Sequence, residues 1–281
     1  MTAKKYVLSL AFALGTIASI SLTPGSFAQT SQPALAPSLE YQLASVLYMQ
    51  KSAEYRALCF QAFNVAHMRL DADLDKKNNK KLSKAERKMP RAIVVDIDET
   101  VLDNSPAQAR GIKTNSPYNS KDWYAWSNMR KAKAVPGSVE FLNYAVSKGV
   151  KIFYISNRDE QNEKQATLEN LKSVGFRDIS SDNVMLRTTE STKEGRRKLV
   201  SDRYRIVILV GDNLDDFSEV FEKKPIADRF AVTVQMRESW GRNFIVLPNA
   251  MYGTWENAIY EYQRLTEAQK AEKRAAALEL P

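Results

Sequence analysis

The main candidates for catalytic residues in this sequence are aspartates that follow two apolar runs, 92–95 and 206–210. These aspartates are Asp96, Asp98, Asp212 and Asp216. Carboxylates gathered at one place repel one another, and a divalent cation removes that conflict. Oxygen ligands of this kind suit Mg²⁺, which also leaves room for the oxygens of a substrate phosphate. We therefore predict a Mg²⁺ site formed by these four aspartates.

A metal-bound carboxylate next to a second carboxyl group is suited to phosphoryl transfer. The bound, ionised carboxylate can attack phosphorus to give an aspartyl-phosphate. The second carboxyl can protonate the leaving oxygen and later take a proton from water. Lys193 can neutralise the phosphoryl oxygens, and Ser156 and the backbone N–H of Asn157 can donate hydrogen bonds to them. A lone Asp-x-Asp also occurs in metal-dependent glycosyltransferases, but its combination with the Ser, the Lys and a Gly-Asp-x-x-x-Asp favours phosphoryl transfer.

The composition excludes several other kinds of site. The chain of 281 residues is 44% hydrophobic and 26% charged, as in an average globular protein. It contains one histidine, His67, and one cysteine, Cys59, which is too few for a structural zinc site or an intrachain disulfide. A catalytic Cys–His or Ser–His pair would have to use His67, which lies in an expected amphipathic helix.

The elements that must position the aspartates alternate between strand and helix. Strands are expected at 92–95, 150–155, 206–210, 230–234 and 244–247. Helices are expected at 39–70, 138–147, 159–174, 193–202 and 255–280. This alternation predicts an α/β fold, a doubly wound Rossmann-like parallel sheet with helical N- and C-terminal extensions. Ligands of such sheets bind at the carboxyl ends of the strands, which is where the aspartates fall.

The first residues form a targeting signal. Residues 1–28 have a basic start, a short apolar run and a small-x-small end, which predicts a signal peptide cleaved after Ala28. An uncleaved membrane anchor is the alternative. Residues 29–38 are expected to be a disordered leader, and no later run is long enough to span a bilayer. The protein is then exported, periplasmic or secreted, without a stable membrane anchor.

Much of the net charge of +8 lies in the basic run 76–91. A surface for nucleic acid would have aromatic residues interleaved with these charges, and this run has none. We therefore expect a solvated connector and no nucleic acid polymer as partner.

Two segments resemble the paired signatures of the bacterial class C nonspecific acid phosphatases, four-aspartate phosphohydrolases of the haloacid dehalogenase (HAD) superfamily. They are Ile93-Val-Val-Asp-Ile-Asp-Glu-Thr-Val-Leu-Asp-Asn104 and Gly211-Asp-Asn-Leu-Asp-Asp-Phe217. Further similar segments are 49–58, 154–158, 191–196 and 248–255, so the likeness covers residues 40–262. The family pattern continues to a tyrosine where this chain has Ala107, which puts the substrate preference in doubt.

The resemblance implies a role for each matching residue. Asp96 is the nucleophile and a metal ligand, and Asp98 is the general acid and base, with its backbone carbonyl on the metal. Asp212 is a ligand, Asp216 a ligand or a neighbour of one, and Ser156 and Lys193 hold the phosphoryl group. Asp103 and Asp215 are read as loop-stabilising residues rather than ligands.

The resemblance also implies the organisation of the chain and its substrates. We expect one phosphatase domain, 39–281, with cap elements near 39–90, 105–135 and 250–281. Trp123 and Trp126 in the cap either stack on the base of a nucleoside 5′-monophosphate or pack a helix against the core. The expected function is a Mg²⁺-dependent acid phosphatase acting on small phosphomonoesters, with a homodimer among the expected assemblies. The alternatives are a phosphotransferase on the same scaffold and a non-catalytic exported ligand-binding protein.

Overall fold

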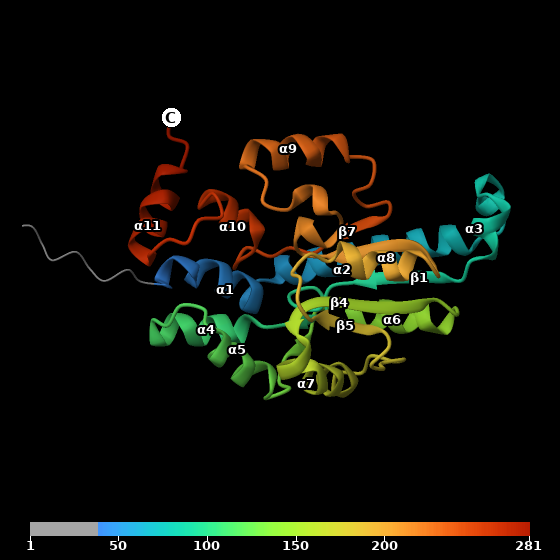
Figure 1. Ribbon diagram of the computed structural model, residues 1–281, viewed down its shortest axis with the longest axis horizontal. Helices are drawn as coiled ribbons and strands as arrows, with labels where there is room; N and C mark the ends of the chain where they lie inside the picture. The colour runs from blue at the N-terminus through green and yellow to red at the C-terminus, as the bar shows by residue number, and fades with distance from the viewer. Residues whose placement is uncertain (1–38) are drawn as a thin grey trace, which may run out of the picture. The chain divides into compact units, whose positions relative to one another are not determined.

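A five-stranded parallel sheet forms the centre of the computed structural model, which describes residues 39–281. The strand order is β5-β4-β1-β6-β7, and all four strand pairings are parallel (Figure 1). The strands are β1 (Arg91–Val95), β4 (Lys151–Asp159), β5 (Val184–Arg187), β6 (Arg205–Gly211) and β7 (Phe244–Val246). The predicted doubly wound α/β fold is thus confirmed. The predicted signal peptide 1–28 and leader 29–38 lie outside the described residues.

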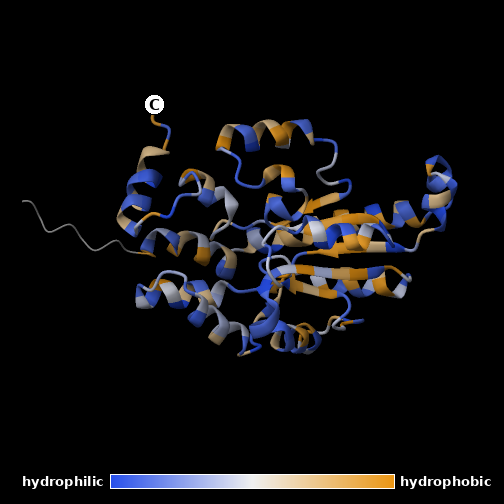
Figure 2. Ribbon diagram, viewed as in Figure 1, coloured by the Kyte–Doolittle hydropathy of each residue, from blue (hydrophilic) through white to orange (hydrophobic). Residues whose placement is uncertain are grey.

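The apolar runs form strands because both faces of the sheet are covered. In β1, Ile93 and Val95 face the larger core, whereas Ala92 and Val94 face a smaller one, as the two-residue period of a strand requires. Figure 2 shows the central strands as the most hydrophobic part of the fold. Such runs are typical of parallel strands buried on both sides.

Helices cover the sheet on its two faces. The larger core receives α2 (Ala53–Leu74), α6 (Ser138–Ser147) and α7 (Glu160–Ser173). On the other face, Val200 of α8 (Glu194–Ser201) packs against β1 and β4. The connection from β6 to β7 contains η3 (Leu214–Asp216), η4 (Glu219–Phe221) and α9 (Ile226–Gln235).

The remaining elements gather at one end of the sheet, at the left of Figure 1. They are η1 (Leu39–Gln42), α1 (Leu43–Lys51), α4 (Ser105–Thr114), α5 (Ser120–Ser127), α10 (Thr254–Ile259) and α11 (Glu267–Ala276). A two-stranded antiparallel sheet, β2 (Leu102–Asp103) with β3 (Lys133–Ala134), lies between β1 and α6 in the chain. These elements surround the carboxyl ends of the central strands.

Three expectations about individual elements are wrong. Residues 230–234 lie in helix α9 and not in a strand, and β5 was not expected. The expected helix 255–280 is interrupted between α10 and α11. The expected helix 39–70 is divided at Ser52, whose side chain caps α2 by accepting from the Tyr55 N–H at 3.0 Å.

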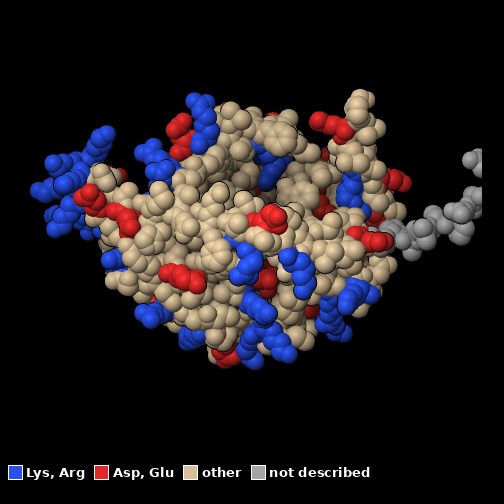
Figure 3. Space-filling view, turned by 180° about the vertical axis from the view of Figure 1, so that it is seen from behind, with Lys and Arg blue, Asp and Glu red and all other residues tan. Residues whose placement is uncertain are grey.

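The basic run, which we expected to be a solvated connector, forms a short, mostly exposed projecting arm. It contains η2 (Asn78–Lys81) and α3 (Lys84–Lys88). Ser83 and Glu86 form a capping box at the N-terminus of α3. Basic side chains gather here, at the left of Figure 3. None of the helices between residues 39 and 281 has the length and hydrophobicity needed to cross a bilayer.

Candidate active site

The predicted catalytic residues meet at the carboxyl ends of β1, β4 and β6. Asp96 follows β1 directly, Ser156 lies in β4, and Asp212 follows Gly211 at the end of β6. Asp216 ends η3, the single turn after β6. Adjacent parallel strands end at the same edge, so residues more than a hundred positions apart come together here.

Three of these carboxylates form a buried cluster. Asp96, Asp212 and Asp216 each offer an oxygen, and these oxygens all lie within 4.8 Å of one another. The Thr100 hydroxyl donates to Asp212 at 3.0 Å, and the Asn249 side-chain amide donates to it at 2.8 Å. Hard oxygen donors held this close together fit a divalent metal ion.

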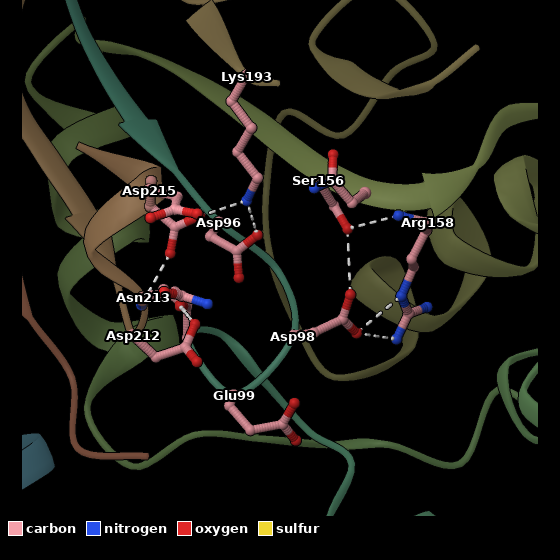
Figure 4. A network of polar contacts seen from close by, with 12 residues as sticks. Asp96, Asp98, Glu99, Ser156, Arg158, Lys193, Asp212, Asn213 and Asp215 are labelled. Atoms are coloured by element: carbon pink, nitrogen blue, oxygen red, sulfur yellow. Dashed lines mark hydrogen bonds and ion pairs between the residues drawn. The ribbon is translucent and has the colours of Figure 1, made fainter. Parts of the chain in front are cut away.

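Lys193 supplies the positive charge beside this cluster. Its Nζ donates to Asp216 Oδ1 at 2.6 Å and to Asp96 Oδ1, and all three side chains are less than 9% exposed. Figure 4 shows the lysine reaching Asp96 from the opposite side of the site to Asp98. Burial acts to lower the pKa of Lys193, but the charges of Asp216 and Asp96 outweigh it and raise that pKa. The ammonium group therefore stays charged and can neutralise phosphoryl oxygens.

Crowding alters the acidity of the cluster. Burial, together with the charge of Asp216, raises the pKa of Asp212 to about 7. Burial also raises the pKa of Asp96, with Lys193 opposing this rise and Asp216 and Asp212 adding to it. A divalent cation at this position would favour the ionised forms, so metal and protons compete for the site.

The side chain of Asp98 points away from the carboxylate cluster. Its carboxylate accepts from Arg158 Nε at 2.9 Å and Nη2 at 2.8 Å, from Ser156 Oγ at 3.1 Å and from Asn104 Nδ2 at 2.9 Å. The labelled side chains of Figure 4 show this separation. The structure therefore divides the four aspartates into three clustered carboxylates and one held apart. Metal binding through the backbone carbonyl of Asp98 stays a prediction.

The predicted phosphate-binding residues differ in their surroundings. Ser156 is buried between Asp98 and the Arg158 N–H, which donates to its hydroxyl at 3.1 Å. The side chain of Asn157 is exposed, and its Oδ1 accepts from Arg196 at 2.7 Å. Its backbone N–H is the group that we expected to bind phosphate, and this expectation stays a prediction.

A cavity of about 960 Å³ opens beside the aspartates. Trp123 and Trp126 of α5 both line it, as does Ala107 at the position where the family pattern has a tyrosine. The Trp126 indole N–H donates to Asn104 at 2.8 Å, and the Trp123 ring centroid lies 5.8 Å from the Arg158 guanidinium carbon. Both tryptophans thus pack on the site and face the cavity.

The two aspartates that we did not expect to be ligands accept hydrogen bonds from residues of α4, α9 and α10. Asp103 accepts from the backbone N–H of Ser105 at 2.8 Å. Asp215 accepts from Arg229 and from the Thr254 hydroxyl, each at 3.3 Å.

Two buried charged residues were missed by reasoning from the sequence. Arg158 is the partner of Asp98, and its side chain is only 1% exposed. Glu99 is buried at a φ of 60°, accepts from the Asn104 N–H at 2.7 Å and from the Tyr252 hydroxyl, and has a pKa raised by burial and by Asp98. Both residues lie within the signature segments, so their charge at a buried strand end was the available signal.

Comparison with known proteins identifies relatives of this arrangement. A family model described as HAD superfamily, subfamily IIIB (acid phosphatase), matches residues 25–255. The structure of the class C acid phosphatase from Bacillus anthracis is 40% identical and has a TM-score of 0.79, covering 86% of this chain and 98% of that one. A second structure of that enzyme, with tungstate bound, has a TM-score of 0.80 at 40% identity, covering 87% and 99%.

Two curated plant proteins are more distant relatives. The stem 28 kDa and stem 31 kDa glycoproteins of Glycine max are each 33% identical over 135 residues, or 44% of this chain. The match spans 51% and 44% of their own lengths, so this chain covers about half of these relatives or less.

Proposed function

The chain belongs to the acid phosphatases of HAD subfamily IIIB, and we propose that it is an exported, Mg²⁺-dependent acid phosphatase. Its substrates would be small phosphomonoesters, including nucleoside 5′-monophosphates, hydrolysed through an aspartyl-phosphate. The observation that carries this proposal is the division of the aspartates. One buried cluster, Asp96 with Asp212 and Asp216, lies beside Lys193, whereas Asp98 is held apart by other partners.

This division gives each carboxylate a separate task. Asp96 is the nucleophile, because it lies in the cluster beside the lysine that neutralises the incoming phosphoryl group. Asp96, Asp212 and Asp216 would hold the cation. When bound, it neutralises these carboxylates and the phosphoryl oxygens and leaves Asp96 ionised.

Asp98 is suited to proton transfer because its two oxygens are not equivalent. Oδ1 accepts from Arg158 and Asn104, whereas Oδ2 accepts from the Ser156 hydroxyl and from no other group of residues 39–281. We assign the transferred proton to Oδ2, which would give it to the leaving oxygen and later remove one from water. A step that needs the acid form of a carboxyl group is fastest at acid pH, which supports an acid phosphatase.

The walls of the cavity support a substrate larger than inorganic phosphate. Tyr118, Trp123 and Tyr252 line it beside the catalytic residues and offer aromatic faces for a nucleobase. The tungstate in the related Bacillus anthracis structure is a tetrahedral oxyanion like phosphate, which further supports a phosphoryl site.

The proposal is tested by replacing Asp96. Residues 29–281 would be assayed at pH 5–6 with a chromogenic phosphomonoester, in Mg²⁺ or in excess EDTA. We expect metal-dependent release of phosphate by the parent protein and none by Asp96→Asn. Asp103→Asn is the matched control, because Asp103 accepts from the Ser105 N–H and lies outside the cluster. Turnover by Asp96→Asn at the parent rate, or no turnover by folded, Mg²⁺-loaded parent protein on several phosphoesters, would refute the proposal.

The proposal extends to the organisation of the chain. Residues 1–28 would be removed on export, which sequencing the N-terminus of the exported protein tests. Residues 39–281 would form one phosphatase domain with cap elements near 39–90, 105–135 and 250–281. Ile226, Phe230 and Val234 leave an exposed apolar stripe along α9, which supports a homodimer. Sedimentation of the protein with and without Phe230→Glu tests that assembly.

A further inference from the structure

Helix α11 contacts the rest of the protein through Arg274, which packs on Tyr41 and donates to Tyr260. We propose that α11 is a wall that selects phosphomonoesters with a large leaving group, and that Arg274 is the positioning residue that holds it. This inference rests on the proposed phosphatase function. The family model ends at residue 255, before α11 (Glu267–Ala276) begins.

The anchor joins the first and last helical segments of the described chain. The Arg274 guanidinium carbon lies 3.6 Å from the ring centroid of Tyr41, which is a close cation–π contact. Arg274 Nη1 also donates to the Tyr260 hydroxyl at 2.6 Å. Tyr41 and Tyr260 both donate to Glu256 Oε1, at 2.9 Å and 2.6 Å. Arg274 therefore closes a network in which each polar group has a partner.

The anchored helix presents polar groups to the cavity. Lys270, one helical turn before Arg274, and Glu267, two turns before it, line the cavity, whereas Arg274 does not. Lys270 Nζ donates to Glu267 at 2.8 Å and lies 5.7 Å from the Tyr260 ring centroid. The wall thus offers both a hydrogen-bond donor and an acceptor to the far end of a bound molecule.

The position of α10 sets how far this wall lies from the chemistry. At its start, Thr254 donates to Asn213 and Asp215, in the loop that carries the catalytic aspartates. At its end is Tyr260, the partner of Arg274. A helix of six residues is about 9 Å long. A nucleoside is longer than a single-ring leaving group, so we expect the nucleoside and not the single ring to reach Glu267 and Lys270.

The test compares a small and a large substrate with the full chain. We expect Arg274→Ala to raise the KM for adenosine 5′-monophosphate about tenfold, with kcat within twofold. Both constants for p-nitrophenyl phosphate should stay within twofold. Arg274→Lys should recover part of the loss. Lys273→Ala is the matched control, because it removes a neighbouring charge that is paired with Glu261 at the surface. It should change KM and kcat for neither substrate.

Binding to an inactive protein separates this inference from the proposed function. In the Asp96→Asn background, adding Arg274→Ala should weaken binding of adenosine 5′-monophosphate about tenfold by calorimetry. Equal affinity in the two proteins, or no binding to Asp96→Asn alone, overturns the inference whether or not the parent enzyme turns over. A KM that is unchanged for the nucleotide, or that rises equally for both substrates, overturns it too.

Discussion

Replacing Arg158 by Met should destabilise the protein strongly, because it leaves the Asp98 carboxylate without its cation. The Arg158 side chain is 1% exposed and that of Asp98 is 18% exposed, and Arg158 Nη2 lies 2.8 Å from Asp98 Oδ1. Removing one partner of a buried ion pair costs about 3–5 kcal/mol, and we expect about 3 kcal/mol because Asp98 keeps some contact with water. At 2–4 °C per kcal/mol for a domain of this size, Tm should fall by roughly 6–12 °C.

A double-mutant cycle isolates the pair. Asp98→Asn alone leaves Arg158 charged and buried. Its other side-chain acceptors within residues 39–281 are the uncharged Thr167 and Asn104. The double variant removes both charges, so its loss should be smaller than the sum of the single losses by about 2 kcal/mol. Urea denaturation in EDTA measures the four free energies of unfolding without any contribution from metal binding.

The matched control is Lys198→Met, which breaks the exposed ion pair with Asp202 at 2.7 Å. It should cost less than about 0.5 kcal/mol. A loss below about 1 kcal/mol for Arg158→Met, or additive losses in the double variant, would refute the reasoning. Either result would mean that the Asp98 carboxylate left without Arg158 is not a destabilising unpaired charge. At low temperature, where Arg158→Met is still folded, its turnover should also fall, because Asp98 loses its orientation.

Three further predictions concern the carboxylate cluster. In Gly211→Ala the added Cβ would lie 2.5 Å from Asp216 Cβ. We therefore expect the free energy of unfolding to fall by about 1–3 kcal/mol and Mg²⁺ binding to weaken. A calorimetric Mg²⁺ affinity equal to the parent's would contradict this. Lys193→Met should lower kcat by about 10²–10³; single-turnover rates check it, and a loss under about tenfold would contradict it. In EDTA, Asp212 should make the protein less stable as pH rises from about 4 to about 7, because its pKa of about 7 exceeds the unfolded value near 4 and the folded state binds more protons. The melting temperature should depend less on pH across this range in Asp212→Asn, and also in the parent protein with Mg²⁺.

The strands that the sequence made predictable are those that carry contiguous apolar runs. β1, β4, β6 and β7 were all expected, because burial on both faces requires such runs. β5 was missed because its apolar run, Val184-Met185-Leu186, is only three residues long and ends at Arg187. Its burial reflects its place at the edge of the sheet.

The wrong strand at 230–234 shows how context overrides propensity. Its β-branched and aromatic residues suit a strand, but Phe230 and Val234 are 67% and 61% exposed in α9. The residue that α9 buries is Arg229, which donates to the Phe221 carbonyl at 2.9 Å and to Asp215 at 3.3 Å. The helical spacing of Ile226, Phe230 and Val234 is visible only over a longer window than residues 230–234.

For the site too, the local sequence predicted where the aspartates lie, but the orientation of one of them depends on residues far along the chain. Aspartates that directly follow strands could be placed together from the sequence, because the ends of parallel strands share one edge. The orientation of Asp98 could not be, because it depends on Ser156 and Arg158, 58 and 60 positions along the chain. Spacing locates such a side chain, and its distant partners decide which way it points.

The bond between Tyr41 and Glu256, 215 positions apart, has a consequence for how the enzyme matures. Contacts of such sequence separation form late in folding, because a long loop must close first. The chain can build its sheet around Asp96 while the far wall of the cavity is still missing. The far wall of the cavity is therefore completed only when the last helices dock.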